Sequence, residues 1–486
     1  MTTTILWYRQ DLRTADHDAL LDACGRGSVV PVFIWDPVGE GNWPCGGAQR
    51  WWIDRSLRML HADLESRGSR LIVRTGDSAT ELLALARECG AQRVHCSRRF
   101  EPAAMAQEEH AVQVLESAGV ELARIGSNYL FDPFAIRSQT GTPYKVFTPF
   151  WRACLAQTAP DAPRPAPIQI PAPKKWPASI GVDALALKPR IAWDAGLSQA
   201  WTPGEAGGLA RLKAFVAGPI GEYSSQRDIP GVHGTSMLAA HLHYGEVGPR
   251  VAWHAAGNAL RGRASEFVAN GEKFRAELGW REFGTHVLAN FPRTAEDPLR
   301  TDYRAFPWRT DPAQLRAWQR GQTGYPIVDA GMRQLWHTGW MHNRVRMVVA
   351  SFLVKHLRIN WIDGARWFWD TLVDADLASN TLGWQWAGGC GADAAPYFRI
   401  FNPMTQGKKF DPEGAYVRRW VPELAGVASD YIHEPWEAPP LALSMSGVTL
   451  GETYPYPIVN HAAARDAALK ALSSISAKTG SVPGDA

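Results

Sequence analysis

Five side chains with distinct chemistry lie close together in the segment DADLASNTLGWQW, which begins at Asp374. Two carboxylates, Asp374 and Asp376, precede the neutral amide of Asn380 and the indoles of Trp384 and Trp386. The small residues between them let a planar ligand approach. Because carboxylates and an amide can bond the polar edge of a ring while indoles stack on its faces, the segment suits a flat, redox-active cofactor.

A second cluster, WMHNRVRM at residues 340–347, supplies cations and another amide. The Arg346 guanidinium beside the Asp374 carboxylate would neutralise both charges and leave the polar edge of a ring available. A purely structural ion pair is the alternative. Together the two clusters resemble the flavin-binding signature of the DNA photolyase and cryptochrome family, and the likeness covers residues 5 to about 436.

The resemblance implies that FAD is the cofactor and that no metal takes part. It places Arg346, Asp374 and Asp376 against the flavin, and Asn380 opposite flavin N5. Repair enzymes of the family carry an amide there, whereas plant cryptochromes typically carry Asp. Because an amide cannot release a proton, Asn380 favours a fully reduced, anionic flavin and repair over signalling. The other cofactor contacts that the resemblance implies are Tyr223, Thr235, Ser236, Met237, Leu238, Phe274 and Asn343.

The sequence GTSML at residues 234–238 resembles the family's phosphate and ribityl clamp at the start of a helix. Hydroxyls and free backbone N–H groups there suit a pyrophosphate. An ordinary Ser/Thr helix cap is the alternative, although the spacing to Tyr223 matches the family. Ala239 departs from the family, which usually has Ser there, and this affects one hydrogen bond to the phosphates.

The helical segment 274–283 places Glu277 and Trp280 three residues apart on one face, where both can line one cavity. A buried Glu alone would more often be structural. By resemblance, Glu277 hydrogen-bonds the damaged pyrimidines, Trp280 stacks on them and Arg281 approaches the DNA backbone. Trp386, Asn343 and Met347 complete the pocket. Because the His pair expected in (6-4) photolyases is absent from that neighbourhood, the resemblance favours cyclobutane dimers.

The DNA site is expected to be a local patch, because the net charge of +3 is too small for the whole molecule to attract DNA. Base extrusion costs a few kcal/mol, and two aromatic platforms at about 1–3 kcal/mol each only offset it. Affinity must then come from phosphate contacts that weaken with salt. The candidates are Arg227, Arg281, Gln406 and Lys408, and solvated surface cations are the alternative.

Tryptophan is unusually frequent, with 22 residues in the chain and 13 of them from Trp253 onward. By resemblance, Trp384, Trp361 and Trp308 form the family's electron-transfer chain from flavin to surface, which restores reduced flavin under light. Core packing is the alternative, and sequence spacing alone does not exclude it.

An antenna chromophore is expected in the first part of the chain. In folate-binding relatives a carboxylate near the fourth strand often binds the pterin, and Glu101 remains here although Ala103 and Ala104 stand where an Asn-Glu pair is common. The segment GGAQRWW at residues 46–52 looks closer to the plant-cryptochrome-like bacterial branch. We expect methenyltetrahydrofolate rather than a deazaflavin, held by a different set of contacts.

Short apolar runs alternate with helical patterns between residues 4 and 126, at 5–8, 29–35, 71–74, 94–96 and 120–125. This alternation predicts βαβ units and a doubly wound, Rossmann-like parallel sheet of about five strands. A helix is predicted over 48–66. Because no strand is followed by GxGxxG, the sheet is not expected to bind NAD in the ordinary way.

Proline punctuates residues 157–205, which favours an extended linker over the surface, and helical patterns dominate from 206 to 440. We therefore predict four regions. They are an α/β antenna-binding domain over 1–130, an interdomain linker over 131–205, an all-α FAD-binding catalytic domain over 206–475 and a disordered tail over 476–486, after a last short helix near 460–473.

The composition is that of a soluble globular protein, with 45% hydrophobic and 20% charged residues among 486. No secretion signal or membrane-spanning run is recognisable. The six cysteines show neither paired spacing nor CxxC, which indicates neither disulfides nor zinc. We expect a monomer in the bacterial cytoplasm or nucleoid, with DNA as its partner and no membrane or obligate protein partner.

The resemblance implies light-dependent repair of cyclobutane pyrimidine dimers by electron transfer from photoexcited reduced FAD to a flipped-out lesion. The resemblance is to class I or plant-cryptochrome-like class III photolyases, which are carbon–carbon lyases. One alternative is a cryptochrome-type blue-light photoreceptor, which would normally bring a long C-terminal extension where only about forty residues follow Pro440. The others are a single-strand-selective relative and a DNA-binding module without catalysis.

Overall fold

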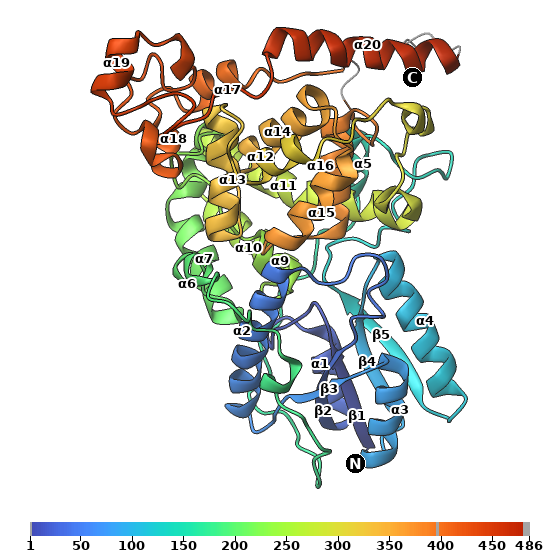
Figure 1. Ribbon diagram of the computed structural model, residues 1–486. Coiled ribbons are helices and arrows are strands. Elements are labelled where there is room, and N and C mark those ends of the chain that lie inside the picture. The colour runs from blue at the N-terminus through green and yellow to red at the C-terminus, as the bar shows by residue number, and fades with distance from the viewer. Residues whose placement is uncertain (1, 395–397, 480–486) are drawn as a thin grey trace. The chain divides into compact units, whose positions relative to one another are not determined.

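The computed structural model describes residues 2–394 and 398–479. Contacts divide the chain into two compact units, whose elements are labelled in Figure 1. Unit 1 comprises Met1–Tyr223, Thr235–Pro292 and Val373–Ala378. Unit 2 comprises Ser224–Gly234, Arg293–Leu372 and Ser379–Ala486.

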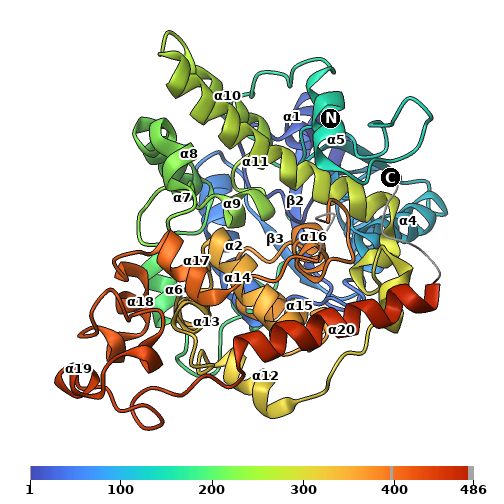
Figure 2. The same cartoon turned by 90° about the horizontal axis from the view of Figure 1, so that it is seen from above.

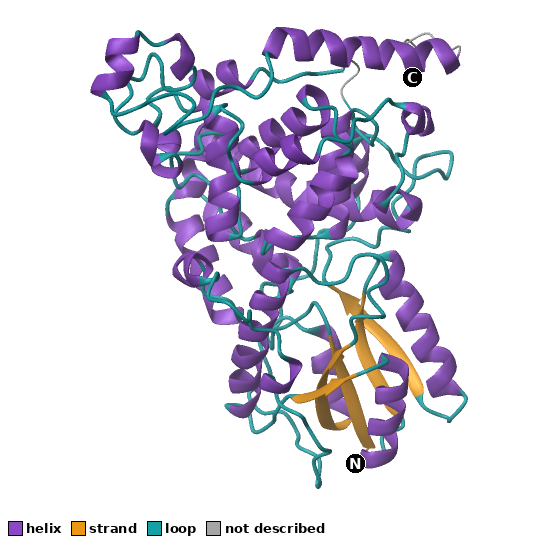
Figure 3. Cartoon of the chain, in the orientation of Figure 1, coloured by secondary structure: helices purple, strands orange, loops and turns teal. Residues whose placement is uncertain are grey.

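Unit 1 begins with a five-stranded parallel sheet in the order β3-β2-β1-β4-β5, drawn in orange in Figure 3. The strands are β1 (Thr2–Tyr8), β2 (Gly27–Trp35), β3 (Ile72–Thr75), β4 (Arg93–Arg98) and β5 (Glu121–Ser127). The helices between them are α1 (Asp18–Arg26), α2 (Gly47–Glu65), α3 (Ser78–Cys89) and α4 (Pro102–Glu116). The predicted doubly wound α/β fold is therefore confirmed, and each predicted apolar run overlaps one strand.

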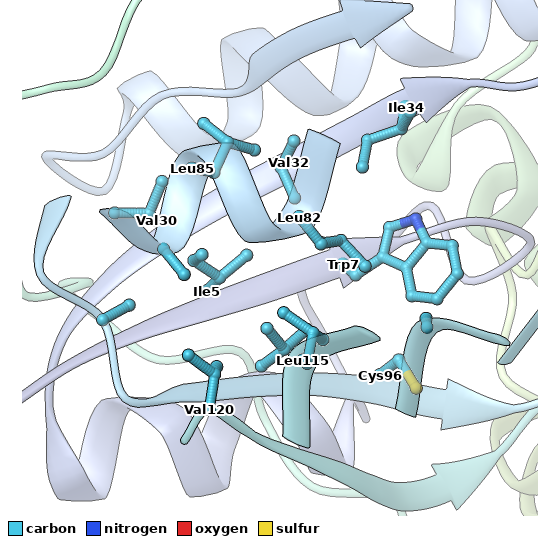
Figure 4. Packing of buried hydrophobic residues seen from close by; sticks show 14 of the residues in the cluster. Ile5, Trp7, Val30, Val32, Ile34, Leu82, Leu85, Cys96, Leu115 and Val120 are labelled. Carbon is cyan, nitrogen blue, oxygen red and sulfur yellow. The ribbon is translucent and has the colours of Figure 1, made fainter. Parts of the chain in front are cut away.

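The core of this sheet explains why the strands are apolar runs. Ile5 and Trp7 of β1 form one buried cluster with residues of β2, with Leu82 and Leu85 of α3 and with Leu115 of α4 (Figure 4). Helix α1 contacts β1, β2, β4 and β5. A parallel sheet covered by helices needs near-continuous hydrophobic strands, and burial of each large side chain contributes about 1.5–3 kcal/mol.

Beyond the sheet domain, the regular elements of unit 1 are helices. Its elements are α5 (Phe147–Leu155), α6 (Ala195–Ala200), α7 (Glu205–Ala217), α9 (Ala239–His243), α10 (Pro249–Leu260) and α11 (Ser265–Asn290), with α8 (Tyr223–Gln226) at its border. Figure 2 shows α10 running beside α11, which it contacts. Hydrogen bonds join these helices to the sheet domain, for example from Asn128 Nδ2 to Leu242 O at 2.7 Å. The domain boundaries predicted at residues 130 and 205 stay a prediction about the organisation of the chain.

The predicted linker is mostly irregular but contains α5 and α6. Its main chain also bonds the sheet domain, because Val29 N donates to Pro171 O at 2.8 Å and Ile180 N donates to Val73 O at 3.1 Å. The proline-rich stretch is thus fixed along unit 1 by backbone hydrogen bonds.

Unit 2 is helical in its described part, as predicted, with only the isolated bridges Arg309–Ile359 and Leu450–Tyr454. Its elements are α12 (Pro312–Gln319), α13 (Pro326–Thr338), α14 (Asn343–Ser351), the π-helix η5 (Phe352–His356), α15 (Trp361–Thr371), most of α16 (Leu377–Gly388), α17 (Pro403–Phe410), α18 (Ala415–Trp420), α19 (Pro440–Met445) and α20 (His461–Thr479). Among the helices of residues 2–394 and 398–479, none combines the length and the apolar character that a membrane-spanning segment requires.

The end of the chain corrects one prediction. Helix α20 continues past residue 473 to Thr479, into the tail that the sequence predicted to be disordered from 476. Ala468, Ala471 and Ile475 are buried at helical spacing, so packing stabilises the helix through its serine-containing part. Residues 480–486 of the predicted tail lie outside the described residues.

Candidate active site

The predicted site residues are divided between the two units. Unit 1 holds Tyr223, Thr235, Ser236, Met237, Leu238, Phe274, Glu277, Trp280, Arg281, Asp374 and Asp376. Unit 2 holds Arg227, Trp308, Asn343, Arg346, Met347, Trp361, Asn380, Trp384, Trp386 and Gln406. Pairings that would join the two sets, such as Arg346 with Asp374, stay predictions.

Three of the predicted cofactor residues come together in unit 1. Tyr223, Leu238 and Phe274 are buried in one apolar cluster that also contains Phe215 and Leu278. The Tyr223 and Phe274 rings meet edge to face, with centroids 5.8 Å apart. The apolar packing of this cluster therefore fixes the positions of these predicted cofactor residues.

The predicted phosphate clamp leads directly into α9. Ser236 Oγ accepts a hydrogen bond from Leu238 N at 3.4 Å, and Met237 has a positive φ of 50°, which is uncommon for a non-glycine residue. Arg211, on α7, donates from Nη1 to Met237 Sδ at 3.5 Å. Burial lowers the pKa of Arg211 below its usual value. The sequence did not single out this cation beside the clamp.

The two carboxylates Asp374 and Asp376 are buried in unit 1. His243 Nδ1 lies 3.3 Å from Asp376 Oδ2, and Gln49 Nε2 donates to Ala375 O at 2.8 Å. Both carboxylates thus lie on a segment that α2 and α9 hold at two points.

Helix α11 carries Glu277 and Trp280 one turn apart, as predicted, and both side chains are half-buried. The Trp280 ring stacks on Phe147 of α5 with centroids 3.9 Å apart and an interplanar angle of 8°. Gly279 permits close approach here, because a Cβ added to it would lie 2.6 Å from Trp151 Cε3. Helix α5 therefore fixes the orientation of the indole that was predicted to stack on DNA bases.

Arg281 has partners inside unit 1. Its Nη1 donates to Asn128 O at 2.8 Å, its Nη2 donates to Leu242 O at 3.2 Å, and the guanidinium lies 4.3 Å from the Tyr129 ring centroid. Its side chain is only 13% exposed. These partners favour a structural role for Arg281 over the predicted DNA contact.

The neighbouring carboxyl group has a displaced pKa. Burial raises the pKa of Glu282 to about 7, although Arg281 and two backbone hydrogen bonds act in the opposite direction. Its Oε2 accepts from Leu130 N at 3.0 Å and from Phe131 N at 3.2 Å. Residues 281 and 282 therefore tie α11 to the chain that follows β5.

In unit 2, α14 begins after His342, whose Nδ1 accepts from Arg344 N at 3.2 Å. Burial lowers the pKa of His342 to about 4, so the ring is neutral at pH 7. Arg346 Nε donates to Met341 O at 2.7 Å. Asn343 is exposed and Met347 is half-buried. The neutral histidine leaves the positive charge of this turn to its arginines.

Asn380 and Trp384 lie on α16 and are buried. Asn380 Nδ2 donates to Ala365 O at 3.0 Å, which leaves Oδ1 as the side-chain atom that can accept from a ligand. Trp384 packs so closely on α15 that a Cβ at Gly364 would lie 2.1 Å from Cη2 of the indole. The Trp384 Nε1–H is buried and has no hydrogen-bond partner among the described residues.

The three tryptophans of the predicted electron chain all belong to unit 2. Trp384 and Trp361 are buried, whereas Trp308 is half-buried and lies 4.4 Å from the Phe306 ring centroid. This order of burial is the one required for a path that ends at the surface. The transfer of electrons along it stays a prediction.

The remaining predicted DNA contacts are also in unit 2. Arg227 is largely buried, with Nε 3.9 Å from Asp228 Oδ1, and the exposed Lys408 forms an ion pair with Glu434. Gln406 of α17 and Trp386 of α16 are half-buried. Gln406 and Trp386 keep surface for a ligand, whereas the ion pair of Lys408 must open before the amine contacts a phosphate.

The predicted antenna residues lie in unit 1, where Glu101, Trp51 and Trp52 are buried and Arg50 is exposed. Glu101 lies beside a hollow at the carboxyl ends of β1 and β4, where Arg99 Nη2 is 3.2 Å from its Oε1. Burial is the largest single influence on the pKa of Glu101 and acts to raise it, but the Arg99 charge and the hydrogen bonds to the carboxylate together outweigh burial and lower the pKa. The hollow measures only about 10 Å³, which is room for about one water molecule. A chromophore therefore needs other contacts than this hollow provides.

The residues present fit a bound FAD. Unit 1 offers buried carboxylates, and unit 2 by itself offers an amide oxygen that can accept and a buried indole N–H without a partner among the described residues. Each of these groups is of a kind that can bond the polar edge of a flavin ring. Sequence reasoning missed His243, Phe147 and Arg211, because each acts on a residue far away in the chain. Gln49 lay in a segment that was singled out, but for the antenna.

Comparison with known proteins identifies the family of the chain. Residues 4–169 match the family model of DNA photolyase, and residues 274–474 match the FAD binding domain of DNA photolyase. The chain is 46% identical to the deoxyribodipyrimidine photo-lyase of Agrobacterium fabrum over 98% of both chains, and 38% identical to cryptochrome-1 of Arabidopsis thaliana over 97% of this chain and 70% of that protein. The crystal structure of a bacterial class III photolyase from Agrobacterium tumefaciens matches with a TM-score of 0.94 and 46% identity, over 98% of each chain. The chain therefore belongs to the DNA photolyase and cryptochrome family and carries its FAD-binding domain.

Proposed function

We propose that this protein is a deoxyribodipyrimidine photo-lyase that repairs cyclobutane pyrimidine dimers in DNA under blue light. The observation that carries the proposal is the geometry of α11, which presents Glu277 one turn from the braced ring of Trp280. A flat aromatic platform beside a carboxyl group suits two linked pyrimidines, which offer flat faces and polar edges. The similarity to photo-lyases over nearly the whole chain supports the same assignment.

The proposed work of the protein is to bind an everted lesion. Eversion costs a few kcal/mol, less for a damaged base, and stacking on Trp280 and Trp386 returns about 1–3 kcal/mol for each ring. Glu277 is proposed to hydrogen-bond the dimer. Phosphate contacts supply the remaining affinity, so binding weakens as salt rises. We propose Arg227, Gln406 and Lys408 for these contacts.

When bound, reduced FAD supplies the photoexcited electron that splits the dimer, and recovers it afterwards. Arg346, Asp374 and Asp376 are proposed to hold the flavin. Because Asn380 Nδ2 is held by Ala365 O, Oδ1 would accept from a cofactor N–H, and an amide has no proton to release to the cofactor. This arrangement favours the fully reduced cofactor that repair requires.

Blue-light incubation with a dimer-containing duplex tests the proposal. The wild-type protein with reduced FAD should remove dimers in light and not in darkness. Trp280→Ala should weaken binding of the damaged duplex about 10- to 100-fold, because the stacking platform is lost. Trp336→Ala is the control, since Trp336 is exposed on α13 and has no part in the proposed site. Absence of light-dependent dimer loss from the wild type would overturn the proposal.

Blue-light signalling is a second candidate, supported by the 38% identity to cryptochrome-1 of Arabidopsis thaliana. It predicts a light-dependent change of the flavin without dimer repair. Preference for single-stranded DNA is a further variant of the repair function. Parallel assays on duplex and single-stranded oligonucleotides separate these outcomes.

We also propose that unit 1 binds a methenyltetrahydrofolate antenna. The hollow beside Glu101 is too small for a chromophore, so we place the antenna near the start of α2, where residues 46–52 look closer to the plant-cryptochrome-like bacterial branch. A near-ultraviolet absorption shoulder in the purified protein would support this. DNA as the partner, a monomeric state and a cytoplasmic location belong to the same proposal. Sedimentation of the purified protein measures the oligomeric state directly.

A further inference from the structure

The segment Val373–Ala378 belongs to unit 1, although the chain on both sides of it belongs to unit 2. It carries Asp374 and Asp376, both buried. A short segment that crosses into the other unit loses backbone freedom, which costs about 1–2 kcal/mol for each residue fixed. Its position must therefore be maintained by specific contacts in unit 1.

The first contact comes from Gln49, near the start of α2. Its Nε2 donates to Ala375 O at 2.8 Å, and its Oε1 accepts from Gly46 N at 2.7 Å. The side chain is almost fully buried. Because both ends of the amide are bonded, its orientation is fixed and Ala375 is held to the N-terminus of α2.

The second contact is a row of three side chains. Gln10 follows β1, and its Nε2 lies 3.2 Å from His243 Nε2, while His243 Nδ1 lies 3.3 Å from Asp376 Oδ2. An amide nitrogen can only donate, so His243 Nε2 accepts and the ring carries its proton on Nδ1. His243 therefore donates to the Asp376 carboxylate.

The backbone around His243 is fixed against the segment that follows the carboxyl end of β1. Leu12 N donates to Tyr244 O at 2.9 Å. A Cβ on Gly245 would lie 2.3 Å from Gln10 O, so the segment after β1 and the segment after α9 approach more closely than any residue with a Cβ would allow. The His243 imidazole is thus held on both of its nitrogens, by Gln10 at Nε2 and by Asp376 at Nδ1.

We propose that His243 and Gln49 are positioning residues of the FAD site, which hold residues 373–378 so that Asp374 and Asp376 meet the cofactor in one fixed geometry. The inference rests on the proposed flavin contact of Asp376. It makes the sheet domain, through α2 and the end of β1, part of the apparatus that binds the flavin.

FAD titration of the apoprotein, followed by flavin fluorescence, tests the proposal. His243→Leu removes the donor to Asp376 and should raise the FAD dissociation constant about tenfold. His243→Asn keeps an N–H donor close to the Nδ1 position and should remain within about threefold of wild type. Gln49→Leu should weaken FAD as His243→Leu does. His254→Leu, a half-buried histidine of α10 that bonds Pro160 O, is the matched control and should bind FAD normally.

A double-mutant cycle with Asp376→Asn separates positioning from a general loss of structure. If His243 acts through Asp376, His243→Leu weakens FAD binding in the wild-type background and has little further effect in Asp376→Asn. Equal weakening in both backgrounds would overturn the proposal. Normal FAD binding by Asp376→Asn would instead show that the proposed flavin contact is wrong, and the positioning role would fail with it.

His243→Gln keeps the test decisive if His243→Leu does not fold. Its longer amide reaches the Nε2 position, so the contact with Gln10 is retained while the donor to Asp376 is lost. We expect weaker FAD binding than in His243→Asn. Equal FAD binding by the Asn and Gln variants would contradict the assigned role.

Discussion

Asp376 and Trp384 are close neighbours in the chain, but they lie in different units and are held in different ways. Asp376 is held by hydrogen bonds, directly from His243 and through Ala375 from Gln49. Trp384 is held by packing, edge to face on Phe368 at 5.0 Å and on Trp318 at 6.1 Å. Hydrogen bonds are directional and fix where a charge lies, whereas close packing fixes where a ring lies.

The largest effect is expected from breaking the packed side. Trp384→Phe should slow light-driven reduction of bound FAD at least about 100-fold, which corresponds to about 2.7 kcal/mol or more in the barrier. The reason is that phenylalanine is far harder to oxidise than indole. Absorbance at the flavin bands under blue light with an external reductant measures the rate.

Trp318→Phe is the matched control for this change. Trp318 is equally buried and touches Trp384, and its Nε1 donates to Val349 O at 3.0 Å. It has no place in the predicted electron chain, so its loss should affect stability more than the rate of reduction. A Trp384→Phe protein that is reduced as fast as wild type would remove Trp384 from the path.

The difference between the two regions also explains what the sequence could predict. The strands and the two motif clusters carry local patterns, and the fold class and family derived from them are confirmed. The roles of His243 and Gln49 depend on residues more than a hundred positions away, which no local pattern encodes. The sequence placed the end of α20 too early, near residue 473, for a local reason. Ser473 and Ser474 resemble a helix end, but their hydroxyls bond carbonyls three residues earlier and leave the helix intact.

In unit 1, where hydrogen bonds hold Asp376, the buried Glu282 should make the free energy of unfolding depend on pH. Its pKa is raised from an ordinary 4.5 to about 7 by burial, so between these values the folded chain keeps a proton that the unfolded chain loses. Proton binding to Glu282 therefore contributes to the stability of the folded chain. This contribution is fully present below pH 4.5 and is lost as pH rises towards 7, by about 3 kcal/mol in total. Glu282→Gln should become more stable relative to wild type across this window.

Urea unfolding at pH 4.5, 6 and 8 measures this change in the free energy of unfolding. Glu272→Gln serves as the control, because Glu272 is an exposed residue of the same helix that pairs with Arg275. Its difference from wild type should not vary with pH as that of Glu282→Gln does. A pH-independent difference for Glu282→Gln would show that the pKa of this carboxyl group is the same in the folded and the unfolded chain.

The smallest effect is expected where unit 1 itself uses ring packing in the site. Phe147→Leu removes the ring that stacks on Trp280 but keeps an apolar side chain, and an aromatic pair contributes about 0.5–1.5 kcal/mol. Binding of dimer-containing duplex should weaken about threefold, less than for Trp280→Ala, because the platform remains but its orientation is no longer fixed. Tyr144→Phe is the control in the same segment, since the backbone N of Tyr144, which bonds His286 Nε2, is unchanged. An effect of Phe147→Leu as large as that of Trp280→Ala would mean that orientation, and not stacking area, determines binding, and that packing in unit 1 acts as strictly as its hydrogen bonds.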